Sequence, residues 1–214
     1  MKKVFAIVLI ACIAFGVAFA AKSADLKVGA QLGYGGMSLK MADAEAPSSN
    51  YIQVSLGGFE FAGTAEYQIA DAVSLKAELG MNLFGKAKTV MCIAGHKSDP
   101  SEADSSTGPN FIIYLGAQYN LELSKEINLG VGAGFDVLMG KLDSEDSDSF
   151  NAAMGLGAEV VGSYAIDKNI SINLGGKFAW HFINTNEDIK NASGSDTRIT
   201  NLAYQIFAGA TYAL

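Results

Sequence analysis

The sequence contains little cysteine, little proline and, after its first 20 residues, no long apolar run. Of 214 residues, 2 are Cys and 3 are Pro. A helix that spans a membrane needs about 20 consecutive apolar residues, and no later segment offers them. A framework of several disulfides and a helical membrane anchor are therefore both excluded for the later part of the chain.

The amino-terminal residues match the pattern of a cleaved secretory signal. Lys2 and Lys3 form a charged start, residues 4–17 are apolar, and residues 18–20 (Ala-Phe-Ala) fit a small-x-small cleavage site. The apolar stretch is short for a membrane span. A lipoprotein signal ending before Cys12 is the alternative, which is disfavoured because the apolar stretch continues past that cysteine. The predicted organisation is a signal peptide over 1–20 and one domain over 21–214.

Positive charge is scarce in the predicted mature chain, residues 21–214. Without Lys2 and Lys3, 13 of the 15 Lys and Arg residues stand against 22 Asp and Glu, a formal net charge of −9. Binding of nucleic acid requires a basic surface, so nucleic acid is not an expected partner. Cys92 is then the only cysteine, and no intramolecular disulfide is available to stabilise the domain.

Apolar residues are nevertheless abundant, and they are dispersed in strict alternation. The chain is 50% hydrophobic with a mean hydropathy of +0.22. Alternation with a period of two is typical of β-strands whose two faces meet different environments. The expected strands begin at Leu26 and then cover about 51–69, 73–83, 111–121, 127–137, 150–164, 170–182 and 202–214. A bulge near Gly57-Gly58 is expected, because Ile52, Val54 and Leu56 are out of phase with Phe59.

The connections between these strands alternate in length. Short ones are expected at 70–72, 124–126 and 167–169, and long polar ones near 38–50, 86–109, 140–149 and 184–198. Short turns at one end and long loops at the other are typical of outer-membrane barrels. An even number of strands places both chain ends on the short-turn, periplasmic side.

The composition of the two strand faces indicates which one meets lipid. One face is almost purely apolar, with aromatic residues toward the strand ends, whereas the other mixes glycines with charges. A soluble lipocalin-like barrel, the main structural alternative, would instead carry many charged residues outside and apolar ones inside. The predicted fold is an all-β, eight-stranded antiparallel up-and-down transmembrane β-barrel. Its lumen is expected to be filled by Gln31, Gln118, Gln205, Tyr114 and Phe207.

The turn centres predict a register for the inward charges. Centring one turn on Asp71 places Glu66 opposite Lys76, and centring another on Lys168 places Glu159 opposite Lys177. Opposite charges across a ladder attract, so two internal salt bridges are expected between these ladder neighbours. The predicted structural network of the lumen comprises Lys27, Glu60, Glu66, Lys76, Glu78, Asp136, Glu159, Lys177 and His181.

The whole chain resembles the small eight-stranded outer-membrane barrels of the OmpA/OmpX type. The most specific local match is the carboxy-terminal insertion signal, which Phe207, Gly209, Tyr212 and Leu214 fit. Family members usually end in an aromatic residue, and Leu214 departs from that pattern. The resemblance implies location in the outer membrane of a diderm, Gram-negative-type cell. It also implies outer-membrane lipid and the β-barrel assembly machinery as partners.

No motif predicts a catalytic, cofactor or metal site. His181 lies on an inward face without a Ser or Asp at a spacing that makes a local catalytic motif. Cys92 and His96, with three residues between them in a long loop, are too few ligands for a metal. Asp143, with the acidic residues that follow it, lacks the glycine and terminal Glu of a calcium loop.

The predicted function is accordingly structural. The barrel is expected to anchor long surface loops that contact an extracellular ligand, in an adhesion-type role. Two alternatives remain open: a narrow, porin-like channel for small solutes or ions, and a lipid A-modifying enzyme. Fold by itself does not choose among these roles.

Overall fold

The computed structural model describes residues 26–43, 45–85, 87–102, 109–141, 150–184 and 197–214. The expected signal peptide lies outside this part of the chain, as does the acidic segment that starts at Asp143. Within the described ranges the structure contains no helix long and apolar enough to cross a membrane.

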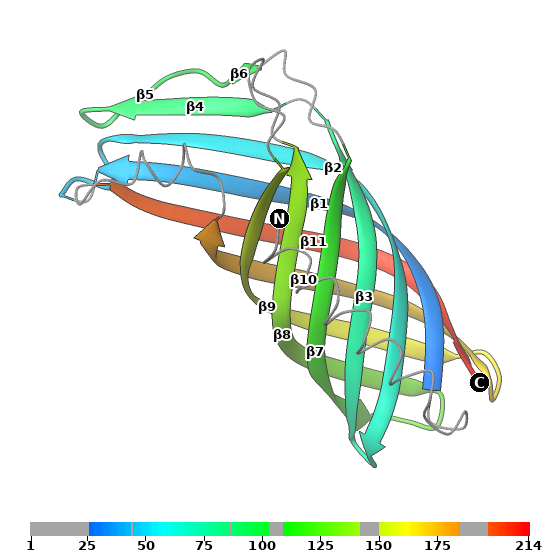
Figure 1. The fold of residues 1–214 in the computed structure, drawn as a ribbon. Helices are drawn as coiled ribbons and strands as arrows, with labels where there is room; N and C mark the ends of the chain where they lie inside the picture. The colour runs from blue at the N-terminus through cyan, green and yellow to red at the C-terminus, as the bar shows by residue number, and fades with distance from the viewer. Residues whose placement is uncertain (1–25, 44, 86, 103–108, 142–149, 185–196) are drawn as a thin grey trace.

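Eight long antiparallel strands form the wall of a closed barrel (Figure 1). They are β1 (Leu26–Asp43), β2 (Tyr51–Ala70), β3 (Val73–Phe84), β7 (Asn110–Glu122), β8 (Ile127–Lys141), β9 (Phe150–Ala165), β10 (Ile170–Asn184) and β11 (Thr197–Ala213). Each strand pairs with its neighbours in chain order, and β1 pairs with both β2 and β11. The predicted eight-stranded, up-and-down barrel is confirmed.

The carboxyl terminus is held by the first strand. Lys27 lies opposite Ala213 in the β1–β11 ladder. The backbone N–H of Leu214 donates to the carbonyl of Leu26 at 3.0 Å. The last strand therefore has no free edge, and closure satisfies backbone groups that lipid could not.

The outer face of the wall is apolar, as the alternation predicts. Its exposed residues include Leu32, Tyr34, Phe59, Phe61, Leu79, Tyr119, Leu156, Tyr164, Leu174, Trp180, Tyr204, Ile206 and Tyr212. The predicted lumen residues Gln31, Tyr114, Gln118, Gln205 and Phe207 are all buried. This inversion, with apolar groups outside and polar groups inside, is the arrangement that a hydrocarbon solvent requires.

Three short turns lie at the end of the barrel where β1 begins and β11 ends. They join β2 to β3 at Asp71-Ala72, β7 to β8 at 123–126, and β9 to β10 at 166–169. In the last of these, the Asp167 carboxylate accepts hydrogen bonds from the backbone N–H groups of Asn169 and Ile170, at 2.7 and 2.8 Å. These side chain-to-backbone bonds satisfy backbone donors of the tight turn within the turn itself.

The predicted bulge at Gly57-Gly58 is wrong. The β1–β2 register runs without interruption from Leu26 opposite Tyr67 to Ala42 opposite Tyr51. Leu56 is buried because it points into the lumen, in phase with Glu60, so apolar residues on β2 change faces without any slip of the ladder. The observed irregularities lie elsewhere, between Gln68 and Ala70 and between His181 and Ile183.

At the other end of the barrel, the described residues contain more β-strand than the sequence predicted. β1 continues to Asp43 and β11 starts at Thr197, so two expected long loops are partly strand. The expected loop 86–109 contains three further strands, β4 (Lys88–Ile93), β5 (His96–Lys97) and β6 (Ser101–Glu102).

These strands extend one side of the barrel wall beyond its rim (Figure 1). β4 pairs with the outer part of β2, from Ser55 to Tyr51, and both β5 and β6 pair with β4. Ala94 and Gly95 have φ values of 49° and 82°, the left-handed conformation that a two-residue hairpin turn needs. We call this sheet of β4–β6 with the outer parts of β1 and β2 the rim sheet.

Candidate functional site

The charged residues of the lumen form one layer across its middle. The ladders place Glu66 opposite Lys76 and Lys177 opposite Glu159, so the predicted register is confirmed at both hairpins. The predicted salt bridges between these ladder neighbours are wrong. Each lysine instead reaches an acid on a strand that is not its neighbour.

Two cross-lumen ion pairs join opposite walls. Lys76 Nζ on β3 lies 2.5 Å from Glu159 Oε2 on β9, and Lys177 Nζ on β10 lies 2.6 Å from Glu78 Oε1 on β3. Lys177 also lies 3.6 Å from Asp136 on β8. A lysine side chain is long enough to span a lumen this narrow. By crossing the lumen, the Lys177 side chain places its ammonium between acids from β3 and β8. Pairing of both lysines along their own ladders would leave Glu78 without a cation.

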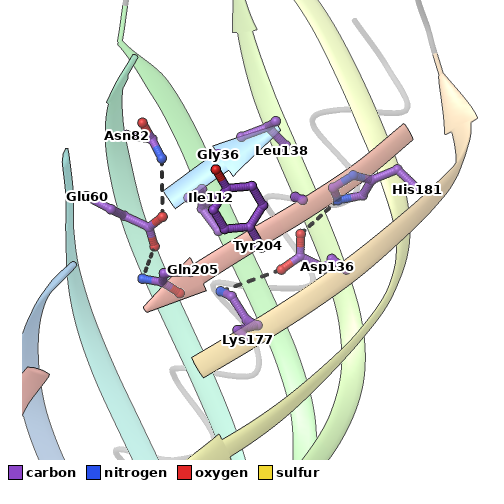
Figure 2. Close-up of a pocket in the computed structure, with 12 residues that line it drawn as sticks. Gly36, Glu60, Asn82, Ile112, Asp136, Leu138, Lys177, His181, Tyr204 and Gln205 are labelled. Atoms are coloured by element: carbon purple, nitrogen blue, oxygen red, sulfur yellow. Dashed lines mark hydrogen bonds and ion pairs between the residues drawn. The ribbon is translucent and has the colours of Figure 1, made fainter. Parts of the chain in front are cut away.

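Histidine and amide side chains bind further acids of the layer (Figure 2). His181 Nε2 lies 2.8 Å from Asp136 Oδ1, so Asp136 lies between His181 and Lys177. The Glu60 carboxylate accepts hydrogen bonds from Asn82 Nδ2 and Gln205 Nε2. Burial of a charge is costly unless hydrogen bonds or opposite charges offset it. Glu60 here receives two amide hydrogen bonds, and the other buried acids of the layer each lie beside a lysine.

Two aromatic rings pack against the lysines. Lys177 Nζ lies 5.3 Å from the centroid of the Tyr114 ring, and Lys76 Nζ lies 5.5 Å from that of Phe207. Both distances are within the range of cation–π attraction. These rings fill the space beside the ion pairs, and they were predicted only as lumen filling.

Sequence reasoning missed Asn82 as a member of the layer. It is buried and donates to Glu60, yet it was not among the predicted network residues. Alternation placed it on the inward face of its strand with Lys76 and Glu78, so the signal was present. The register that places Glu66 opposite Lys76 also places Asn82 opposite Glu60, so the turn centred on Asp71 could have predicted this contact.

The predicted network residues Lys27 and Glu66 lie at the short-turn end, opposite each other in the β1–β2 ladder. Their charged groups are 3.9 Å apart and both are partly exposed. They line an open polar cavity of about 500 Å³ that ends near Lys76 and Phe207. The lumen is thus a wide polar vestibule below the charged layer.

Above the layer the lumen narrows and becomes apolar. Met37, Leu56, Ile112 and Leu138 pack together there. A cavity of about 30 Å³ lies beside Met37 and Leu138, and another of about 30 Å³ lies among the charged residues of the layer itself. A cavity of that size holds about one water molecule. Side chains therefore fill the passage between the vestibule and the outer mouth.

The structure separates the two candidate metal ligands of the rim sheet. His96 lies opposite Ile93 and Lys97 opposite Cys92, so Cys92 and His96 point to opposite faces of the β4–β5 hairpin. Cys92 is buried. In the part of the chain that the structure describes, no group of three or more His, Cys, Asp or Glu side chains could hold a metal ion.

The residues of the predicted insertion signal divide between the two faces of β11. Phe207 is buried in the lumen, whereas Tyr212 and Leu214 are exposed on the outer face. Gly209 lies against Gln31, where a Cβ would come within 2.5 Å of the Ala30 carbonyl oxygen. The outward pair is thus available to a membrane or to another protein.

Comparison with known proteins places this geometry in context. A family model described as "Outer membrane protein beta-barrel domain" matches residues 7–193. The structure of Neisserial surface protein A (NspA) is similar at 16% identity, with 89% of this chain and 97% of that chain covered and a TM-score of 0.57. The outer membrane protease OmpT from Escherichia coli is similar at 12% identity, with 88% and 96% covered and a TM-score of 0.54. A search of curated protein sequences found no match.

Proposed function

Because the chain belongs to the outer membrane protein beta-barrel domain family, we propose that it is a non-conducting membrane anchor that presents the rim sheet at the cell surface. The protein is located in the outer membrane of a Gram-negative-type cell and contacts outer-membrane lipid. The single observation that carries the proposal is the charged layer across the lumen. It blocks the barrel with the Lys76–Glu159 and Lys177–Glu78 pairs.

The blocked lumen supports an anchoring role over a transport role. Eight strands enclose only enough room for side chains. Here the layer is buried, and the apolar cluster above it closes the outer side. A solute would have to displace paired charges and packed apolar groups in succession.

The rim sheet supports a contact role at the surface. It extends the wall at the end opposite the short turns and exposes Met91 and Ile93. Ile52, which lies opposite Met91, is exposed as well, and a contiguous exposed apolar patch outside a membrane often marks an interaction site. We propose an extracellular ligand that binds to this sheet, in an adhesion-type function.

An enzymatic role has less support. The barrel fold occurs in proteins named as a surface protein and as a protease, so fold alone does not decide the matter. His181, the candidate for lipid A chemistry, is buried in the lumen and bonded to Asp136. A lipid headgroup at the rim would not reach its ring.

Two measurements on the full mature protein test the proposal. Planar bilayers with the wild-type protein should show no discrete conductance. Protease added to intact cells should cut within 87–102 and leave the short turns at Asp71, Lys125 and Lys168 uncut. Steady wild-type conductance would overturn the anchor role, and cuts at the short turns would overturn the orientation.

A narrow channel is the second candidate, and the vestibule of about 500 Å³ is the observation that favours it. The vestibule leads solvent to the Lys76–Glu159 pair. The double substitution Lys76→Ala, Glu159→Ala removes that pair. If the protein is a channel, wild type should conduct and the conductance should rise in this variant. Absence of conductance in both proteins would eliminate the channel function.

The outward residues Tyr212 and Leu214 support a further partner, the β-barrel assembly machinery. We propose that it recognises this end of β11. Tyr212→Ala should slow assembly into the membrane more than Tyr119→Ala, an exposed aromatic on β7. Equal assembly rates in both variants would remove the idea.

A further inference from the structure

The outer face of β1 and β2 changes from apolar to polar at one height, and that of β11 changes one row farther out. On β1 it reads Leu32, Tyr34, Gly36, Ser38, Lys40, and on β2 it reads Phe61, Phe59, Gly57, Ser55, Gln53. The β1–β2 ladder places Tyr34 opposite Phe59 and Ser38 opposite Ser55. On β11 the exposed Tyr204 gives way to Leu202 and then Thr200.

Aromatic rings mark the upper limit of the lipid-facing band. The Tyr34 and Phe59 rings pack edge to face at 5.9 Å. The glycines above them make room for tyrosine hydroxyls, since a Cβ on Gly57 would lie 2.7 Å from Tyr34 Oη and one on Gly36 would lie 2.6 Å from Tyr204 Oη. Tyrosine rings favour the boundary between hydrocarbon and headgroups. The outer boundary of the membrane therefore lies at Gly36 and Gly57.

Lysines follow directly above this boundary, on the same face. Lys40 lies opposite Gln53, and Lys88 lies opposite Ser55 on the far side of β2. Lys97 lies opposite Cys92, one row farther out. With strands about 4.8 Å apart and residues about 3.3 Å apart along each strand, the Cα atoms of Lys40 and Lys88 are about 12 Å apart. Two lysine side chains at that spacing can reach one phosphate between them.

The floor between the lysines is polar and ordered. Gln53 Nε2 donates to Ser38 Oγ at 2.8 Å, and Lys40 Nζ lies 4.1 Å from the centroid of the Tyr51 ring. The contact with Tyr51 holds the Lys40 ammonium close to the sheet. The paired positions of this face of the rim sheet hold three lysines and one acid, Glu102, which lies opposite Lys88. The face is basic in a domain whose expected net charge is strongly negative.

We propose that the outward face of the rim sheet binds the phosphate-bearing headgroup of an outer-leaflet lipid through Lys40 and Lys88. Lys97 lies farther out and adds long-range attraction. The height of the lysines just above the tyrosine boundary, the polar floor and the sign of the charge fit a membrane headgroup. The inference does not depend on whether the lumen conducts. It adds a lipid site to the proposed anchor, and it orients the rim sheet against the membrane surface.

Native mass spectrometry of the detergent-purified mature protein with added lipid A tests the site. The double variant Lys40→Gln, Lys88→Gln should bind the lipid more weakly by about 5-fold per lysine. The control variant Lys125→Gln, Lys168→Gln removes two exposed lysines at the short-turn end and should bind like wild type. Lys40→Arg keeps the charge and should retain binding. Because these side chains lie on the surface, thermal unfolding of all variants should be unchanged.

Matched ligands separate the headgroup from other sources. Wild type and the double variant should bind dephosphorylated lipid A with equal affinity. Excess inorganic phosphate should compete only weakly with lipid A for binding to wild type. The proposal is overturned if the double variant binds lipid A as wild type does, or if the control variant loses as much binding. It is also overturned if inorganic phosphate displaces the lipid stoichiometrically, which would indicate a site for soluble anions.

Discussion

Lys76 lies opposite Glu66 in the β2–β3 ladder, yet its ammonium is 2.5 Å from Glu159 on the far wall of the lumen. For Lys76, backbone pairing and charge pairing thus follow different partners, whereas Lys27 and Glu66 are partners in both. Glu66 is left near the more exposed Lys27. The cross-lumen pair ties β3 to β9, strands that share no ladder, and so stabilises the barrel against deformation of its cross-section.

Loss of the cross-lumen partner of Lys76 should strongly destabilise the barrel. Glu159→Gln leaves the Lys76 ammonium buried without its counter-charge, and we expect a loss of about 3–5 kcal/mol in the free energy of unfolding. Glu66→Gln, whose ion pair is longer and partly exposed, should cost less than about 1 kcal/mol. Urea unfolding of the protein in lipid vesicles measures both values. Equal losses would show that the ladder partner matters as much as the partner across the lumen.

A double-mutant cycle should identify the true partner of Lys177. The cycle of Lys177→Met with Glu78→Gln should give a coupling energy of about 2 kcal/mol, since the two groups are 2.6 Å apart. The cycle with Glu159→Gln, the ladder neighbour of Lys177, should give less than about 1 kcal/mol. A larger coupling to Glu159 would restore the pairing that the sequence predicted.

Gly155 should not tolerate a side chain. A Cβ there would lie 1.8 Å from the Trp180 carbonyl oxygen and 2.6 Å from the His181 Cα, so the backbone of β10 would have to move. We expect Gly155→Ala to cost about 3 kcal/mol. Gly162→Ala, on the same strand, meets its nearest atom at 3.7 Å and should be close to neutral. Similar unfolding free energies for the two variants would contradict the close approach of β9 and β10.

Charge on the apolar wall should destabilise the barrel according to depth. Leu174 is 67% exposed and lies opposite Ala208, between the Tyr204 and Tyr212 ends of β11. Leu174→Arg should cost about 2–4 kcal/mol, because the guanidinium enters hydrocarbon. Ile93→Arg, at a residue 71% exposed in the rim sheet, should cost less than about 0.5 kcal/mol. Vesicle-based unfolding tests both, and a neutral Leu174→Arg would place that residue outside the membrane.

Cysteine labelling should report the orientation of the rim sheet. Cys92 is 2% exposed, so a maleimide reagent should react with it slowly in the folded protein and rapidly in urea. In a Cys92→Ser background, a membrane-impermeant maleimide should label Ile93→Cys on intact cells. Lys168→Cys, in a short turn, should stay unlabelled until the cells are opened. The reverse pattern would invert the topology.

Much of the barrel follows from local pattern. The period of two assigned all eight wall strands and their lipid-facing sides, and the positions of Asp71 and Lys168 fixed two registers correctly. The predicted bulge failed because the alternation was read as one apolar face along the whole of β2. Leu56 instead faces an apolar part of the lumen, so the interior changes from polar to apolar along its length.

The rim sheet was missed for a related reason. Residues 86–109 are polar and carry Gly and Pro, which favour a loop interpretation. β4 becomes a strand because the outer part of β2, beyond the end of β3, offers unpaired backbone groups. The sequence of 86–109 carries no information about how far β2 extends past β3, so its strands could not be read locally.

The sequence by itself determined the barrel, the environment of each strand face and which charges enter the lumen, because a period-two pattern is a local property of each strand. Only the tertiary structure decided that Lys76 pairs with Glu159, that Lys177 pairs with Glu78, and that lysines of β1 and β4 share one face. Those relationships depend on barrel diameter, strand stagger and strand length. These are properties of the closed sheet, and no single strand encodes them.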